Sequence, residues 1–355
     1  MLHKLDSQET LRRQNTTRRQ RLDICIFHPL RLHSFFPYEL RPATQSHLLQ
    51  TALIMVEVLE VIFLVYLVIS WISGTILNSW IGIIYLQDWR RHRSAGICDQ
   101  ITFIMSSINV VLQFTLTMDG MFQVFRLYSK LSKDYYICVS IFMFFLCDIS
   151  SWHTTWLAIS YFLRLVSVSH PFFLRLRSCF PSSALPLLLA SVLGSFLINL
   201  PFFFTTHVAL LDFPTNESYT SMYTQKYHPS SILLHVVFSC CLPIIFTLPC
   251  IGLSVKSLLG HVWKMRQSSS QYSFSPQLQA LVQAAGTMIL RVVTELTFNL
   301  IMTAIISMSY EMPLTIVAIL WFLVMIFPTV QSIILIMGSP RLRSRLLGHG
   351  EPSTM

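Results

Sequence analysis

The sequence has few charged side chains. Asp, Glu, Lys and Arg together make up 12% of its 355 residues, about half the share of an ordinary soluble domain. Hydrophobic residues make up 53%, and the mean hydropathy is +0.59. So low a charge content excludes an ordinary soluble globular protein and indicates an integral membrane protein.

Sequence patterns typical of several enzyme classes are also missing. The chain contains no HExxH, GxSxG, Walker or CxxC pattern, and the acidic residues inside its apolar stretches are not arranged as a catalytic pair. We therefore expect no enzymatic activity, no metal site and no cofactor. The two halves of the chain share no repeat and no paired helices broken by Gly or Pro, which disfavours a secondary transporter.

Long apolar stretches fill most of the chain instead. About 20 apolar residues suffice to cross a bilayer as a helix, and such segments lie at 58–86, 100–122, 137–165, 184–206, 231–259, 280–308 and 314–338. The predicted fold class is an all-α membrane protein with a seven-transmembrane helix bundle over residues 55–340 and a short tail over 341–355. Seven spans place the two ends of the bundle on opposite sides of the membrane.

The distribution of Lys and Arg between the loops predicts the orientation, because these residues are retained in the cytoplasm. The richer set of loops and flanks holds Arg90, Arg91, Arg93, Arg175, Arg177, Lys256, Lys264, Arg266, Arg341, Arg343 and Arg345. The other set holds Arg126, Lys130, Lys133 and Lys226. We expect a multi-pass protein of the plasma membrane with an extracellular start of the bundle and a cytoplasmic C-terminus.

Residues 1–54 conflict with this orientation, because they form a basic arm on the side that should be poor in cations. Two interpretations stay open: a disordered extension that is carried across the membrane, or an upstream stretch wrongly joined to a protein that starts at Met55. We favour the second, because Met55 directly precedes the first span. Much of the net charge of +9 comes from this arm, so that charge does not indicate nucleic-acid binding.

The eight cysteines lie mostly in or beside the predicted spans, where they serve as small apolar residues. Cys138 is expected at the outer end of the third span, yet residues 207–230 contain no Cys with which it could form a disulfide. The same segment carries the sequon Asn216-Glu217-Ser218. Because the loop is assigned to the outside, we expect glycosylation at Asn216.

In the stretch Trp152–Leu174, WHTTWLAISYFLRLVSVSHPFFL, an apolar helix ends at Arg164 and is followed by a Ser-His-Pro turn. It resembles the end of the third helix and the second inner loop of the taste receptor type 2 (bitter taste receptor) family. Three further blocks resemble the same family in register: Asn78 with Asp88-Trp89 and Asp99-Gln100-Ile101, Leu242-Pro243 with Ser257-Leu258, and Pro328 to Arg343. The vomeronasal type 1 receptors are the nearest alternative, and the DW…DQI and LIxGxxxLR blocks favour the taste family.

The resemblance implies a G-protein-coupled receptor that binds small bitter compounds and activates a gustducin-like heterotrimeric G protein. It assigns G-protein coupling to residues at the inner ends of the helices: Tyr161, Arg164, His170, Pro171, His261 and Lys264. The chain also departs from the family. Asn109 stands where the family has Arg, Cys147 and Asp148 stand where it has Asn and His, and Glu295 stands where it has Tyr.

Acidic residues inside the spans need an explanation, since a charge at a helix centre costs about 2.5–3.5 kcal/mol on insertion scales. Glu295 can pair with Arg291, one turn earlier on the same helix. Asp148 has no basic partner close in its own helix, so it is either protonated or bonded to a neighbouring helix. The functional alternative is that Asp148 and Asp119 make an outward cavity anionic and favour amine-bearing bitter compounds.

Binding sites in helix bundles form between facing helices. We expect the cavity between the outer halves of the third, fifth, sixth and seventh spans. Its predicted ligand-binding residues are Asp119, Met143, Phe144, Cys147, Asp148, His235, Ser239, Glu295, Asn299, Thr303, Val317 and Leu320. The richness in Phe and Met suits a pocket that re-packs around different ligands, although such side chains also face lipid.

Overall fold

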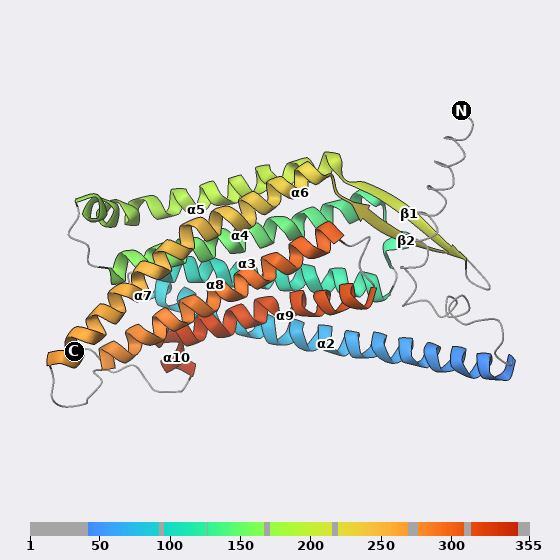
Figure 1. The fold of residues 1–355 in the computed structure, drawn as a ribbon, viewed down its shortest axis with the longest axis horizontal. Helices are drawn as coiled ribbons and strands as arrows, with labels where there is room; N and C mark the ends of the chain where they lie inside the picture. The colour runs from blue at the N-terminus through green and yellow to red at the C-terminus, as the bar shows by residue number, and fades with distance from the viewer. Residues whose placement is uncertain are drawn as a thin grey trace, which may run out of the picture.

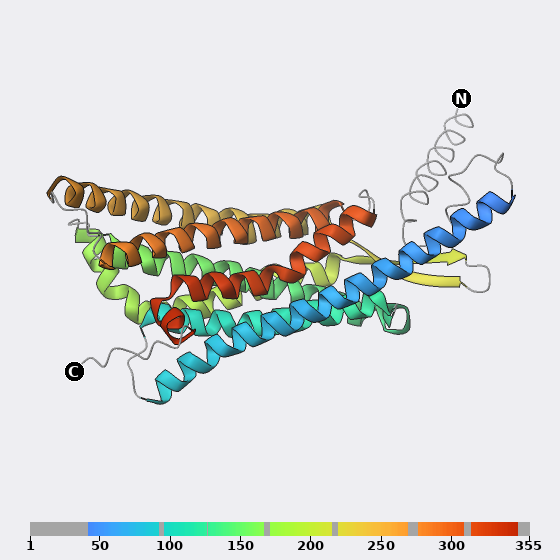
Figure 2. The same ribbon diagram turned by 90° about the horizontal axis from the view of Figure 1, so that it is seen from below.

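The computed structural model describes residues 42–91, 96–125, 127–166, 171–214, 219–268, 276–308 and 314–346. Within them, seven helices are long and apolar enough to cross a membrane. They lie alongside one another in an elongated bundle (Figures 1 and 2). Their bounds are α2 Pro42–Arg90, α3 Ile97–Val124, α4 Lys133–Leu165, α5 Pro171–Thr205, α6 and α7 with the π-helix η3 between them (Pro229–Val236, Val237–Cys241 and Leu242–Ser268), α8 Pro276–Met308, and α9 Leu314–Gly338.

The predicted seven-span bundle is confirmed, and each spanning helix overlaps its predicted segment. One prediction about a loop was wrong. Pro171 was expected to lie in the turn that follows the third span, but it is the first residue of α5. Proline suits that position because the first helical residues need no intrahelical N–H donor. Residues 167–170, which include His170, lie outside the described part of the chain.

A β-hairpin was not predicted. Strands β1 (His207–Pro214) and β2 (Tyr219–Lys226) pair antiparallel, from His207 opposite Lys226 to Pro214 opposite Tyr219. Gln225 donates a hydrogen bond to the Ser140 hydroxyl over 2.8 Å, which ties the hairpin to α4. Asn216 belongs to the connection between the strands, outside the described residues, so its glycosylation stays a prediction.

The bundle has two distinguishable ends. We call the end that carries the hairpin the hairpin end, and the opposite end, where the short helix α10 (Pro340–Leu346) follows α9, the α10 end (Figure 1). The basic arm and the start at Met55 stay predictions. Residues 1–41 lie outside the described part, and α2 begins at Pro42, upstream of the expected first span.

Helices α2, α3 and α9 are joined by amide side chains in their shared interface. Asn109 of α3 donates to Oδ1 of Asn78 on α2 over 3.3 Å, and Asn78 donates to the Pro328 carbonyl of α9 over 3.3 Å. Gly74 lets the helices approach closely, since a Cβ there would lie 2.6 Å from Oε1 of Gln113 and 2.8 Å from Oγ1 of Thr329. Hydrogen bonds and close packing of this kind drive helix association in membranes.

Helix α4 runs through the middle of the bundle and contacts α3, α5, α7 and α8. Its central segment is buried although it is polar, and contains Asp148, Ser150, Ser151, His153, Thr154 and Thr155. In a bilayer such groups must find partners inside the protein. The candidate functional site lies around this segment.

Candidate functional site

Asp148 is a buried acid whose two carboxylate oxygens are both hydrogen-bonded to neighbouring helices. The residue is only 1% exposed. Oδ2 accepts a hydrogen bond from Asn199 of α5 over 2.5 Å. Oδ1 accepts one from the Ser239 hydroxyl of η3, and Nδ1 of His235 on α6 lies 3.5 Å away from it. The sequence left two structural explanations for Asp148 open, protonation or a bond to a neighbouring helix. The structure shows bonds of the second kind, and through them Asp148 joins three spans.

The π-helix beside Asp148 presents a backbone acceptor to the same region. Pro243 has no N–H to donate to the carbonyl four residues before it, which belongs to Ser239. That carbonyl accepts hydrogen bonds from the Ser151 hydroxyl over 3.1 Å and from the Asn299 amide over 3.3 Å. Short π-helical turns often occur at functional sites. Here side chains of α4 and α8 both donate a hydrogen bond to the same carbonyl oxygen of the turn.

Glu295 and Arg291 of α8 form a second polar group, one helical turn apart and each 4% exposed. Their spacing predicted that they pair, and in the structure two side chains link them. Gln331 of α9 donates to Oε2 of Glu295 over 2.5 Å and accepts from Nη2 of Arg291 over 2.8 Å. Thr154 of α4 donates to the same carboxylate oxygen over 3.2 Å and accepts from Nε of Arg291 over 3.3 Å. We call these four residues the Arg291–Glu295 network.

The network joins α4, α8 and α9 and balances one negative charge with one positive charge. A buried ion pair is tolerated when hydrogen bonds satisfy its remaining polar atoms. Two atoms fall short of this: Oε1 of Glu295 and Nη1 of Arg291 have no hydrogen-bond partner among the described residues. The network is thus incompletely satisfied at each of its charged ends.

A narrow crevice with a cavity volume of about 20 Å³, enough for about one water molecule, lies between α4, α7 and α8. Its polar lining is contributed by Ser151, Thr154, Thr155, Thr247, Glu295 and Asn299, and its apolar lining by Cys240, Pro243, Ile244, Val292 and Leu296. Glu295 and Asn299 were predicted site residues. The other polar lining residues were not singled out from the sequence.

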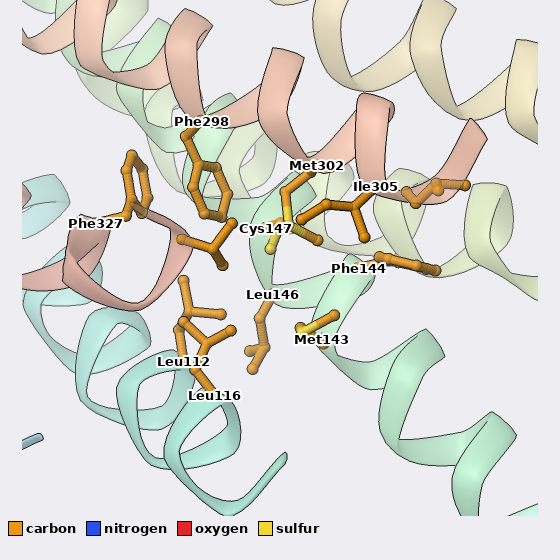
Figure 3. Close-up of a cluster of buried hydrophobic side chains, with 12 residues drawn as sticks. Leu112, Leu116, Met143, Phe144, Leu146, Cys147, Phe298, Met302, Ile305 and Phe327 are labelled. Atoms are coloured by element: carbon orange, nitrogen blue, oxygen red, sulfur yellow. The ribbon is translucent and has the colours of Figure 1, made fainter. Parts of the chain in front are cut away.

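The predicted apolar ligand contacts meet in one packed cluster toward the hairpin end. Met143, Phe144 and Cys147 of α4 face Met302 and Ile305 of α8 (Figure 3). Leu320 of α9 packs against the same cluster from one side. These side chains are neighbours in the structure, and their contact with a ligand stays a prediction. They fill the space between the helices, so a ligand entering here has to displace them.

Polar predicted residues border this cluster. His235 lies against Phe144 with ring centroids 5.7 Å apart. The hydroxyl oxygen of Thr303 on α8 lies 3.9 Å from the sulfur of Cys240. Asp119 is buried near the hairpin end of α3. The side chain of Val317 lies outside the described part of the structure.

The predicted coupling residues gather at the α10 end as far as they are described. Tyr161 is half-buried against a cluster that includes Ile101 and Leu335, whereas Arg164 and Pro171 are exposed. His261 and Lys264 belong to the last turns of α7, and their side chains are not described. Exposed cationic and aromatic groups at a helix end suit either contact with lipid headgroups or contact with a partner protein.

Two acids from the DW…DQI block hold α10 in place, a role that sequence reasoning did not assign. The Asp88 carboxylate forms an ion pair with Arg341 over 2.6 Å and accepts a hydrogen bond from Arg345 over 3.3 Å. Asp99 lies 3.7 Å from Arg341, measured between Oδ2 and Nη1. The basic residues of the tail thus serve in a structural contact inside the protein.

Sequence reasoning missed Asn199, Gln331, Ser151 and Thr154 as partners of the buried acids. A usable signal existed for the two amides, because Asn199 and Gln331 are polar residues inside apolar spans. For Ser151 and Thr154 the signal was weak, since a hydroxyl in a membrane helix commonly bonds to its own backbone.

Comparison of the sequence with known proteins identifies a family. The model of the family described as taste receptor protein (TAS2R) matches residues 55–348. The chain is 22% identical over 283 residues to taste receptor type 2 member 119 of Mus musculus, covering 79% of this chain and 82% of the relative. It is 24% identical over 295 residues to member 9 of Homo sapiens (82% and 94% covered) and 27% identical over 296 residues to member 7 of Macaca mulatta (79% and 90% covered).

Proposed function

The chain belongs to the taste receptor type 2 family, and from that premise we propose what it senses and how it signals. It binds small bitter compounds, amine-bearing ones among them, in the half of the bundle toward the hairpin end. Binding separates the helices at the α10 end, where Tyr161, Arg164 and the start of α5 engage a gustducin-like heterotrimeric G protein. Lipids of the plasma membrane surround the bundle.

The observation that carries the ligand proposal is the position of Asp148. It is a buried acid between α4, α5 and the fifth span, directly beside the Met143–Phe144–Cys147 side of the apolar cluster. A carboxylate offers about four lone-pair sites, so Asp148 can accept a donor from a ligand in addition to Asn199 and Ser239. An ammonium group is the donor that such a charge attracts most strongly.

The apolar cluster supports a pocket that adapts to its ligand. Met143 and Met302 are flexible and polarizable, and such side chains re-pack more easily than branched ones. An agonist then activates the receptor only to the extent that it binds the opened arrangement more tightly than the packed one. Broad selectivity and modest affinity are the expected result.

We infer that the hairpin end faces outward and the α10 end faces the cytoplasm. The Lys and Arg distribution supports this orientation, since the α10 end carries Arg164, Arg341 and Arg345. Glycosidase treatment of the full chain and of an Asn216→Gln variant tests it. We expect the full chain to carry a glycan that the enzyme removes, and the Asn216→Gln variant to carry none. An unglycosylated Asn216, together with a C-terminus that an antibody reaches on intact cells, would overturn the orientation.

The receptor function is tested by calcium release in cells that carry a suitable G protein. The full chain and a chain that starts at Met55 are each exposed to a panel of amine-bearing and neutral bitter compounds. We expect responses to several compounds, with amines among them, and none in cells without the receptor. Receptors that reach the surface and respond to no compound of the panel would contradict the proposal.

A further inference from the structure

The tetrapeptide Arg-Leu-Arg-Ser occurs twice in the chain, at residues 175–178 and at residues 341–344. The first copy lies near the start of α5 and the second lies in α10, so both are found at the α10 end (Figure 1). In each copy the serine hydroxyl donates to the carbonyl of the first arginine, over 3.3 Å in the first copy and 2.9 Å in the second. A serine that follows two closely spaced arginines has the charge pattern that arginine-directed protein kinases bind in an acidic substrate groove.

The two copies differ in what their arginines contact. In the second copy, Arg341 pairs with Asp88 of α2 over 2.6 Å, and Arg345, which directly follows the serine, donates to the same carboxylate over 3.3 Å. Arg341 also lies 3.7 Å from Asp99 of α3. Among the described residues, no acid forms an ion pair with an arginine of the first copy. Only the second copy therefore belongs to the contact that holds α10 to the bundle.

A phosphate on Ser344 would compete for the arginine that anchors α10 most closely. Phosphoserine carries a charge of about −1.5 to −2 at pH 7 and three acceptor oxygens. Ser344 and Arg341 are three residues apart on the helix, so their side chains are neighbours, and a guanidinium binds a phosphate with two parallel hydrogen bonds. The phosphate would also repel Asp88, and it would stand in the last turn of α10, where the helix dipole disfavours negative charge. All three effects weaken the attachment of α10 to α2.

Docked α10 shields Ser344 from a kinase. Ser344 is half-buried, and Leu342, two residues earlier, is fully buried in a cluster with Ile101 and Leu335. A kinase has to take the serine and its flanking residues into its groove, so this segment must first leave the cluster. A helix of seven residues is too short to be stable by itself and depends on its contacts with the bundle. The transient release of α10 therefore sets how fast Ser344 can be modified.

We propose that Ser344 is a phosphorylation site for an arginine-directed kinase, and that its phosphate keeps α10 released from Asp88. The Ser344 hydroxyl oxygen attacks the γ-phosphorus of ATP, the bond to ADP breaks, and the hydroxyl proton passes to a carboxylate of the kinase. The site rests on the orientation proposed above, because kinases and ATP meet α10 only in the cytoplasm. Release removes Leu342 from the cluster against which Tyr161 packs, so the modification changes the proposed coupling surface.

The test uses the purified full chain in detergent, where both ends are accessible, so its outcome is independent of the orientation and of the receptor assay. The protein is incubated with Mg-ATP and, in turn, the catalytic domains of protein kinases A and C. Modified serines are identified by mass spectrometry. We expect phosphate on Ser344 with at least one kinase. Amide hydrogen exchange in α10 should then be about tenfold faster than in a Ser344→Ala protein treated in the same way.

Asp88→Asn loosens α10 in advance and should speed the modification of Ser344 about tenfold without speeding that of Ser178. If this variant does not fold, Asp99→Asn weakens the same anchor from α3 and should give a smaller increase.

Ser178→Ala is the matched control, because it removes the serine of the other copy, whose arginines do not anchor α10. Phosphorylation of Ser344 should still speed exchange in α10 of this variant. The proposal would be overturned by the absence of phosphate on Ser344 with both kinases. It would also be overturned by unchanged exchange in phosphorylated α10, or by equal acceleration at both serines in Asp88→Asn.

Discussion

Gln331 of α9 donates a hydrogen bond to the Glu295 carboxylate of α8 over 2.5 Å, and the carbonyl of the same amide accepts from Arg291 over 2.8 Å. One neutral side chain thus contacts both members of a buried pair of opposite charges. Since Glu295 and Arg291 lie on the same helix, the amide holds that helix to α9 at two points. The stability of the bundle and its ability to open should both depend on it.

Replacing Gln331 with Leu should destabilise the receptor. The change removes two hydrogen bonds to charged groups and leaves Glu295 with Thr154 alone, at a cost of about 1–3 kcal/mol. The thermal midpoint of the purified protein should fall, and ligand-free signalling should rise because α8 is held less firmly. Thr297→Val is the control, because it removes only a bond within α8. A Gln331→Leu protein with the wild-type midpoint would show that the network contributes nothing to stability.

Replacing Asp148 with Asn should lower the potency of amine agonists but not that of neutral agonists. The loss of one charge contact should raise the concentration of an amine needed for half-maximal response about tenfold, or about 1.4 kcal/mol. Neutral agonists should keep their potency. Asp134→Asn makes the same change at the exposed start of α4 and should leave both unchanged. Equal losses for amines and neutral compounds would assign Asp148 a structural role only.

Replacing Tyr161 with Ala should reduce G-protein activation without preventing folding. Tyr161 is half-buried at the α10 end, so the change removes an aromatic group from the proposed coupling surface. Surface expression and calcium release are measured together. Tyr135→Ala, an exposed Tyr at the hairpin end of α4, is the matched control. A Tyr161→Ala receptor that reaches the surface and signals normally would count against coupling through this residue.

Replacing Asp88 with Asn should release α10. Asp88 is buried and contacts Arg341 and Arg345, so its loss leaves both arginines without their common partner, a cost of about 1–3 kcal/mol. Amide hydrogen exchange in α10 should speed up. Asp99→Asn should have a smaller effect, because Asp99 is more exposed and lies farther from Arg341. Equal exchange in wild type and Asp88→Asn would disprove the anchoring role.

Adding a methyl group at two glycines should have opposite effects. Gly74→Ala pushes a Cβ against Gln113 and Thr329, and overpacking of this kind costs about 1–3 kcal/mol. Gly252→Ala meets no atom within 4 Å and should stabilise α7 by about 0.5–1 kcal/mol through helix propensity. The two thermal midpoints check this, and a Gly74→Ala protein as stable as wild type would show that α2 can shift outward freely.

Local patterns predicted the spans well, because a helix in lipid must be apolar over a fixed length regardless of its neighbours. Local patterns gave wrong predictions where contacts with other segments of the chain decide the structure. The β-hairpin over 207–226 pairs two strands across a turn, and α5 begins at Pro171, which was expected in the turn before it. The acids at 119, 148 and 295 were recognised from their cost in the membrane, but the partners of Asp148 and Glu295 on other helices were not.

The sequence by itself determined the membrane class, the seven spans and the family resemblance, since each of these depends on residue type and spacing along one chain. Only the tertiary structure decided what the buried polar groups bond to. Asp148 meets Asn199 and Ser239, and Glu295 meets Gln331, over separations of 36 to 91 residues. Hydrogen bonds between helices depend on how the helices rotate and pack against one another, and that rotation is set by the whole bundle.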